Sequence, residues 1–91
     1  MLEKNIVKRI MASLKEDGFF CIKIHGSEYQ MAGLPDVLAL KGGRAYWLEV
    51  KRPGGKPTPL QVRMIEKLKG FGCVAGVVFS VEEAKELVNG E

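Results

Sequence analysis

A Gly-Gly pair at residues 42–43, placed between two short apolar runs, constrains the fold of this chain more than any other feature. Residues 35–40 and residues 45–50 are both rich in strand-forming side chains, and a two-residue glycine turn between such runs is typical of a tight β-hairpin. A turn centred between the two glycines pairs residues whose numbers sum to 85. Asp36 and Glu49 then face one another, with Cβ atoms about 4.5–5.5 Å apart.

Lys51 is expected on the same face as these two carboxylates, because strand side chains alternate between faces with a period of two. Like charges at opposed positions destabilise a hairpin, so a positive charge must offset the repulsion between Asp36 and Glu49. A divalent cation would do so, with the Lys51 ammonium as a partial substitute. The three side chains are also compatible with the solvated rim of an ordinary hairpin. Against that simpler interpretation, they interrupt apolar runs and gather at the open end of the hairpin.

The first half of the chain shows a helix followed by a strand and then the hairpin. Apolar residues at helical spacing predict a helix over residues 2–16, ending at Asp17-Gly18. Residues 19–25 form the first predicted strand, and residues 26–34 form a polar loop that leads into the hairpin.

The second half adds a crossover to the hairpin. Thr58, Pro59 and Gln61 have the residue types of a helix N-terminus with a capping box. Residues 73–79 form an apolar strand that we expect to be central in the sheet and covered on both faces, and a last helix ends near residues 89–90. A strand, a helix and a further strand form a parallel crossover unit. Residues 1–91 are therefore expected to form a single α/β domain, with a mixed β-sheet, flanking helices and the order α-β-β-β-α-β-α.

The charged residues and their surroundings resemble the PD-(D/E)XK nuclease superfamily, and within it the stand-alone VRR-NUC branch. The signature is Pro35-Asp36 followed by Glu49-Val50-Lys51, and Gly33 completes a G-x-P-D box. The resemblance covers essentially the whole chain. It implies a restriction-endonuclease-like core, a layout similar to archaeal-type Holliday-junction resolvases, an origin that is often phage, and metal-dependent DNA cleavage.

The resemblance also implies a metal site. Asp36, Glu49 and the backbone carbonyl of Val50 would bind Mg²⁺ or Mn²⁺, since Mg²⁺ prefers oxygen ligands. A helix-borne acid is expected to join them, and Glu3 in the first predicted helix is the candidate. A glutamate at that position also favours the helix dipole, which is a simpler reason for its presence.

Two further residues are given catalytic roles. Lys51 would orient the attacking water and stabilise the charge that develops on the phosphate. Gln61 is predicted to hydrogen-bond the water or the phosphate. The simpler interpretation of Gln61 is that it completes the cap of its helix with Thr58, and the two roles are compatible.

The net charge of +3 fits a polyanionic partner without requiring one. Basic residues gather around the hairpin and the loop after it, which suits contact with a phosphate backbone, although an ordinary mixed surface would also carry them. The predicted DNA contacts are Lys41, Arg44, Arg52, Lys56, Lys23 and His25. The acidic residues gather near the C-terminus, at Glu82, Glu83, Glu86 and Glu91.

These observations predict a DNA endonuclease that recognises the shape of branched, junction or flap DNA, because so small a chain has no sequence-reading motif. The resemblance implies a homodimer that places two sites on such a substrate. The alternative is a non-catalytic DNA-binding accessory module that keeps the nuclease fold, and cleavage of RNA also remains open. The start of the chain lacks a signal-peptide layout and no apolar run would span a bilayer, so we expect a cytoplasmic protein, in the host cell if phage-encoded.

Overall fold

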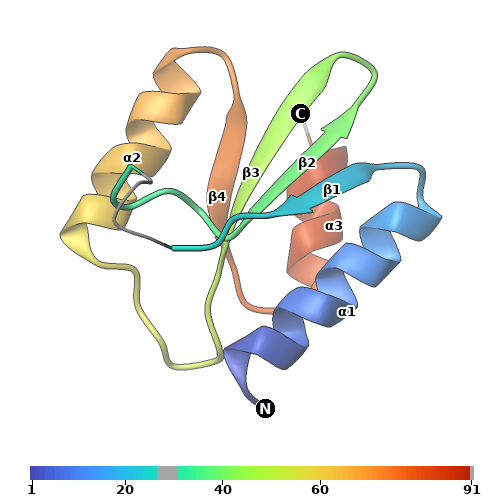
Figure 1. The fold of residues 1–91 in the computed structure, drawn as a ribbon, viewed down its shortest axis with the longest axis horizontal. Helices are drawn as coiled ribbons and strands as arrows, with labels where there is room; N and C mark the ends of the chain where they lie inside the picture. The colour runs from blue at the N-terminus through green and yellow to red at the C-terminus, as the bar shows by residue number, and fades with distance from the viewer. Residues whose placement is uncertain (27–30, 91) are drawn as a thin grey trace.

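The computed structural model describes residues 1–26 and 31–90, which form a four-stranded mixed sheet flanked by helices (Figure 1). The elements are α1 (Glu3–Glu16), β1 (Phe20–Lys23), β2 (Val37–Lys41), β3 (Arg44–Val50), α2 (Pro59–Gly70), β4 (Val74–Val78) and α3 (Val81–Asn89). The predicted order of elements is confirmed. Residues 27–30 of the predicted polar loop and Glu91 of the predicted acidic group lie outside the described residues. None of the described helices has the length and apolar character needed to cross a membrane.

The strands lie in the order β1-β2-β3-β4, with an antiparallel meander of the first three and a parallel β3–β4 pair. This confirms the mixed sheet. The expectation that the last strand is central is wrong, because β4 lies at the edge of the sheet in the described part of the chain. Both α2 and α3 contact β4, and this helical cover, not a strand on each side, accounts for its apolar sequence.

The β2–β3 hairpin has the predicted register. Lys41 pairs with Arg44, and Val37 pairs with Leu48, so paired residue numbers sum to 85. The glycines of residues 42–43 have φ values of +59° and +77°, as a type I′ turn requires at both central positions. One step beyond the last pair, the same register brings Asp36 opposite Glu49.

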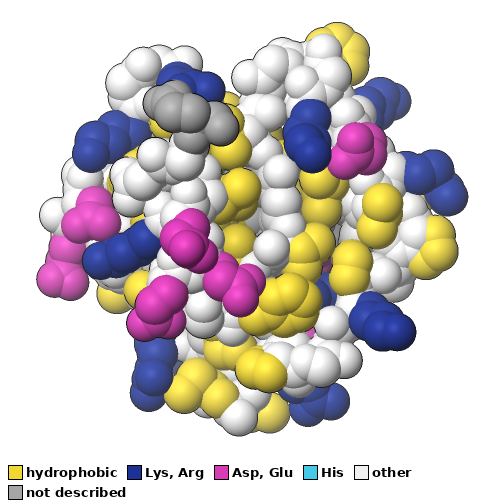
Figure 2. Space-filling model, turned by 180° about the vertical axis from the view of Figure 1, so that it is seen from behind, with side chains coloured by type: hydrophobic (Ala, Val, Ile, Leu, Met, Phe, Trp, Pro, Cys, Tyr) yellow, Lys and Arg dark blue, Asp and Glu magenta, His cyan; other side chains and the backbone are white. Residues whose placement is uncertain are grey.

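The sheet separates the main core from the face that carries the charges. Tyr46 and Leu48 point into the core that α1 and α3 complete, whereas Trp47 and Glu49 point to the other face. Helix α2 packs on β3 and β4 across that second face, where Ile65 is buried. Figure 1 shows α2 on one side of the sheet and α1 and α3 on the other. Seen from behind, acidic side chains gather over α3, with lysines and arginines around the margin (Figure 2).

We expect Gly33→Ala to destabilise the fold more than Gly72→Ala. Both glycines have positive φ values, +85° and +93°, so each substitution carries about 1–2 kcal/mol of backbone strain. At Gly33 the new Cβ would lie 3.0 Å from Cγ and 3.1 Å from the carbonyl oxygen of Leu60 in α2, whereas Gly72 faces open space. Urea unfolding in EDTA should show an additional loss of about 1 kcal/mol or more for Gly33→Ala.

Equal losses of stability for the two variants would show that the close approach of Gly33 to Leu60 in α2 does not contribute to the stability of the fold.

Candidate active site

Asp36 lies just before β2 and is fixed there by a buried neighbour and two hydrogen bonds. Pro35, immediately before it, is fully buried, and the carbonyl of Asp36 accepts a hydrogen bond from the Ile24 N–H at 2.8 Å. The Asp36 side chain reaches β3, where Oδ2 accepts a hydrogen bond from the Val50 N–H at 2.8 Å. The carboxylate is therefore fixed against the strand that carries Glu49.

This second role of Asp36, as a hydrogen-bond acceptor for β3, was not predicted from the sequence. Strand β2 begins only at Val37, so the Val50 N–H lies beyond the paired part of β2 and donates to a side-chain acceptor instead. Short carboxylate side chains commonly supply such local acceptors. The sequence signal for this role was Pro35 directly before Asp36. Proline has no N–H for strand pairing, so regular pairing is expected to end there and a neighbouring side chain can serve as acceptor.

Glu49 is the one buried charged residue in the part of the chain that the structure describes, with 1% of its surface exposed. Its Oε2 atom lies 3.5 Å from Nζ of Lys51. Its Oε1 atom is buried with no hydrogen-bond partner among the described residues. Burying a carboxylate oxygen without a partner is costly. Oε1 is therefore suited to bind a ligand from outside the protein.

The pKa of Glu49 is raised to about 7, first by burial and then by the neighbouring Asp36 carboxylate. The Lys51 ammonium acts in the opposite direction and lowers the pKa. Asp36 is thus close enough to Glu49 to disfavour its ionisation, as expected if the hairpin register brings the two side chains together. A strongly raised pKa with a specific charge partner is typical of functional sites.

Lys51 extends the parallel pairing of β3 and β4 beyond the end of β3. Its N–H donates to the carbonyl of Val78 at 3.0 Å, and its side chain is 15% exposed beside Glu49. The ammonium and both carboxylates therefore meet where a parallel strand ends and the chain turns toward the next helix. In open α/β sheets this is where ligands bind.

The carboxylate pair fits a hard divalent cation. Asp36 and Glu49 offer oxygen ligands, one of them unpartnered, and Mg²⁺ needs only one or two carboxylates because it keeps several waters. No cluster of three or more Asp, Glu, His or Cys residues is found among residues 1–26 and 31–90. Glu3, half-buried in the first turn of α1, is thus not joined to the pair. Its role as a ligand, like that of the Val50 carbonyl, stays a prediction.

Gln61 forms the helix cap that the simpler interpretation predicted. Its Oε1 accepts a hydrogen bond from the Thr58 N–H at 2.9 Å, and its own N–H donates to Thr58 Oγ1 at 3.2 Å. These two bonds satisfy donors at the start of α2. A contact of Gln61 with substrate stays a prediction.

Two of the predicted DNA contacts lie far from the carboxylates. Lys41 and Arg44 flank the hairpin tip, which is five strand residues, or about 17 Å, from Asp36. Nζ of Lys41 donates to the Asp17 carbonyl at the end of α1, at 2.7 Å. Arg44 lies over the Tyr46 ring, 5.8 Å from its centroid. Lys41 and Arg44 therefore do not lie beside the carboxylates.

The other predicted DNA contacts lie near the open end of the hairpin. Arg52 and Lys56 are exposed on the loop that follows Lys51. Lys23 ends β1 and donates from Nζ to the Ile24 carbonyl at 2.7 Å, and His25 is exposed. Contact of any of these residues with DNA stays a prediction.

Comparison with known proteins gives the family. The model of the family described as archaeal Holliday junction resolvase (Hjc) matches residues 2–82. The chain belongs to this family. A relative of this Hjc-family chain, named "Putative nuclease p44", comes from Acyrthosiphon pisum secondary endosymbiont phage 1. It is 32% identical over 71 residues, which are 77% of this chain and 74% of the phage protein.

Solved structures agree with this membership. A VRR_NUC domain superposes with a TM-score of 0.79 and 28% identity, over 97% of this chain and 95% of its own. A second VRR_NUC domain protein gives 0.80 at 20% identity, over 97% and 85%. Archaeoglobus fulgidus Hjc, a Holliday junction resolvase from an archaeal hyperthermophile, gives 0.68 at 22% identity, over 85% and 67%. The predicted VRR-NUC and resolvase-like fold is confirmed. The family and the phage relative together support nuclease activity for the Hjc-family chain.

We expect the stability of the Hjc-family chain in EDTA to fall as the pH rises from about 4.5 to about 7. Folded Glu49 keeps its proton up to about pH 7, whereas the unfolded chain loses it near its ordinary pKa of about 4.3. The folded state therefore binds more protons in this window, and the stability from Glu49 is complete below it and lost above it. The loss amounts to at most about 4 kcal/mol, measured by urea unfolding across pH.

Glu49→Gln is the matched control, because it keeps the shape of the side chain and removes its titration. Parallel stability curves for the two proteins over this window would show that Glu49 ionises like an exposed glutamate.

Proposed function

We propose that this chain is a Mg²⁺- or Mn²⁺-dependent endonuclease that hydrolyses phosphodiester bonds in branched, junction or flap DNA. The observation that supports this most directly is the buried Glu49 carboxylate, with one unpartnered oxygen, beside Asp36. An ordinary strand position would place an apolar side chain there. The solvated-rim interpretation does not account for a glutamate that is 1% exposed.

In the proposed metal site, Asp36 and Glu49 hold the ion, with the Val50 carbonyl and Glu3 as further ligands. The chemistry that such an ion supplies is polarisation of the scissile phosphate and a lowered pKa of a nearby water. Asp36 is positioned for this by its hydrogen bond to the Val50 N–H. Because that bond uses Oδ2, the other carboxylate oxygen, Oδ1, remains to face the ion.

Lys51 serves the reaction as a fixed positive charge. It contacts Oε2 of Glu49 at 3.5 Å, which leaves Oε1 for the ion and holds the ammonium next to the phosphate position. From there it orients the attacking water and stabilises the negative charge that develops on the phosphate oxygens. Gln61 already uses Oε1 in the helix cap, so its amide N–H groups are what remains for substrate.

DNA is the proposed partner, as expected of a resolvase-family chain. Arg52 and Lys56 continue from Lys51 on an exposed loop, where they would contact backbone phosphates without reading sequence. Lys23 and His25, at the end of β1, are proposed to add contacts at the other side of the hairpin opening. Lys41 and Arg44 at the tip are proposed for the more distant part of a branched substrate.

We expect Asp36→Asn to abolish cleavage without destabilising the fold. The amide keeps an oxygen that can accept the Val50 N–H, while the loss of charge relieves repulsion with Glu49, so stability in EDTA should be unchanged or slightly higher. Cleavage of labelled junction, flap and linear duplex DNA in Mg²⁺ or Mn²⁺ should fall about 100-fold or more. Wild-type cleavage should vanish in EDTA.

Lys51→Ala extends this test, because it keeps both carboxylates and should slow cleavage while Mg²⁺ binding in calorimetry survives. Lys69→Ala is its charge-matched control, since Lys69 is exposed and pairs with Glu66 on α2. Retention of DNA by the wild-type protein without cleavage under any cation would support the accessory-module alternative. A large loss of stability in Asp36→Asn would make Asp36 a structural residue.

The proposed assembly is a homodimer, because a junction resolvase must present two sites to a branched substrate. Light scattering of the purified protein should give twice the 10.1 kDa mass of one chain. Phe20 is 65% exposed on the α2 side of the sheet, and burial of such a side chain against a second copy would favour association. A mass of one chain at the concentration that supports cleavage would contradict the dimer.

A further inference from the structure

We propose that a cavity behind the catalytic end of the sheet binds one unpaired nucleobase of the DNA substrate. This inference rests on the proposed nuclease function and adds to it a physical basis for the choice of branched or flap DNA. The cavity has a volume of about 310 Å³, which lies at the small end of the range for ligand pockets, about 300–1,000 Å³. It has room for a single flat heterocycle.

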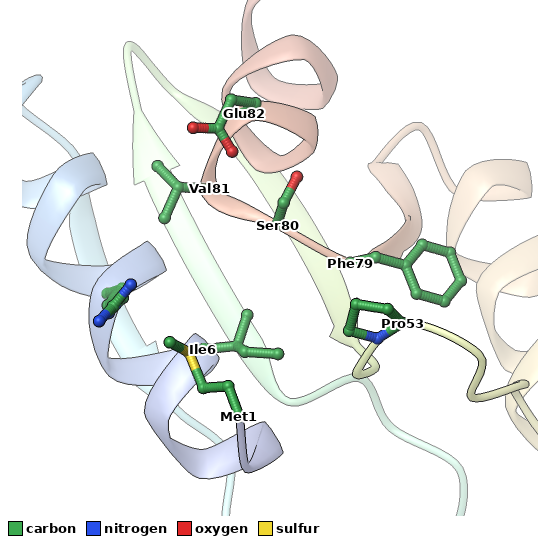
Figure 3. A pocket seen from close by; sticks show the side chains of 8 residues that line it. Met1, Ile6, Pro53, Phe79, Ser80, Val81 and Glu82 are labelled. Atoms are coloured by element: carbon green, nitrogen blue, oxygen red, sulfur yellow. The ribbon is translucent and has the colours of Figure 1, made fainter.

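The cavity lies where three segments meet: the start of α1, the loop after β3 and the junction between β4 and α3 (Figure 3). Ile6 and Met1 form the wall on the α1 side, and Pro53 lies across from them. The segment from β4 into α3, which carries Phe79, Ser80 and Val81, lies above Ile6 and Pro53 in this view. The lining residues are Met1, Ile6, Arg9, Pro53, Phe79, Ser80, Val81 and Glu82.

Two of these segments connect the cavity directly to the carboxylate site. Pro53 follows Lys51 by two residues, so their Cα atoms are at most about 7 Å apart. Phe79 follows Val78, whose carbonyl accepts the Lys51 N–H at 3.0 Å. The cavity therefore lies at the same end of the sheet as the carboxylates, on the face that α1 and α3 cover. A strand that passes this end of the sheet can place a neighbouring nucleotide at the cavity.

The chemistry of the lining favours an uncharged base over a phosphate. Most of the walls are apolar, which suits the faces of a nucleobase. The Glu82 carboxylate would repel a phosphate but can accept a hydrogen bond from an exocyclic amino group, as carboxylates do from cytosine. Ser80 Oγ accepts the Glu83 N–H at 3.1 Å, so its own proton remains to be donated to a base. Arg9 adds a cation at the margin for the phosphate attached to that base.

An unpaired base satisfies these conditions and a paired base does not. In duplex DNA the amino groups of the Watson–Crick edge are already hydrogen-bonded and the base is stacked, so entry would cost a few kcal/mol of unpairing and unstacking. In a single-stranded flap that cost has already been met. Shape recognition then follows from one small cavity and needs no base-reading surface.

The test uses flap DNA that carries the fluorescent base 2-aminopurine, bound by the wild-type protein in EDTA so that no cleavage occurs. With the probe at the first unpaired position, binding should change its fluorescence at least twofold. The same probe placed in the middle of the duplex arm should not respond. Flap DNA should also bind more tightly than blunt duplex of equal length.

Val81→Phe fills the cavity and should remove both the fluorescence change and most of the preference for flap DNA. Arg9→Ala provides a second variant at an exposed position, with Lys8→Ala as its control, since both remove one positive charge from α1 and only Arg9 lines the cavity. We expect Arg9→Ala to lower flap affinity several-fold more than Lys8→Ala.

The outcomes separate the two proposals. Failure of the wild-type protein to bind or cleave any DNA overturns the proposed function and this inference with it. Metal-dependent cleavage with flap preference, but no fluorescence response, or equal effects of Arg9→Ala and Lys8→Ala, overturns the cavity proposal alone.

Discussion

Burial of the Glu49 carboxylate beside Asp36 is the constraint on which the rest of this structure depends. A buried carboxyl whose pKa is raised by desolvation and by the neighbouring Asp36 carboxylate, with one oxygen left unpartnered, is costly in the isolated fold. The hydrogen bond from the Val50 N–H to Asp36 and the Lys51 ammonium offset part of that cost. A bound cation would offset the remainder, so the cost of burying Glu49 and the proposed function have the same origin.

The sheet provides the geometry that this charge arrangement needs. The antiparallel hairpin brings Asp36 to β3, and the parallel β3–β4 pair carries Lys51 past the end of the strand through its bond to Val78. Main-chain pairing therefore sets the positions of all three charged groups. Helix α2 covers the neighbouring part of the same face, which keeps Glu49 away from bulk water and gives its charge a larger effect.

Several details could not have been predicted from the sequence, because they depend on where distant segments meet. An apolar run such as β4 is the same in sequence whether strands or helices cover it, so its place at the sheet edge was missed. Lys41 has the positive charge expected of a DNA contact, yet its ammonium binds the Asp17 carbonyl at the C-terminal end of α1, a position set by the packing of that helix. The cavity between α1, Pro53 and the start of α3 likewise joins residues that lie far apart along the chain.

The sequence by itself determined the hairpin, its register and the face shared by Asp36, Glu49 and Lys51, because a two-residue glycine turn and strand alternation are local rules. It also determined the family, since the signature residues lie on those local elements. Only the tertiary structure decided that Glu49 is buried with an unpartnered oxygen and that Gln61 caps α2. It also separated the hairpin-tip cations from the site. Burial and spacing between elements depend on packing across the whole chain, which no local pattern records.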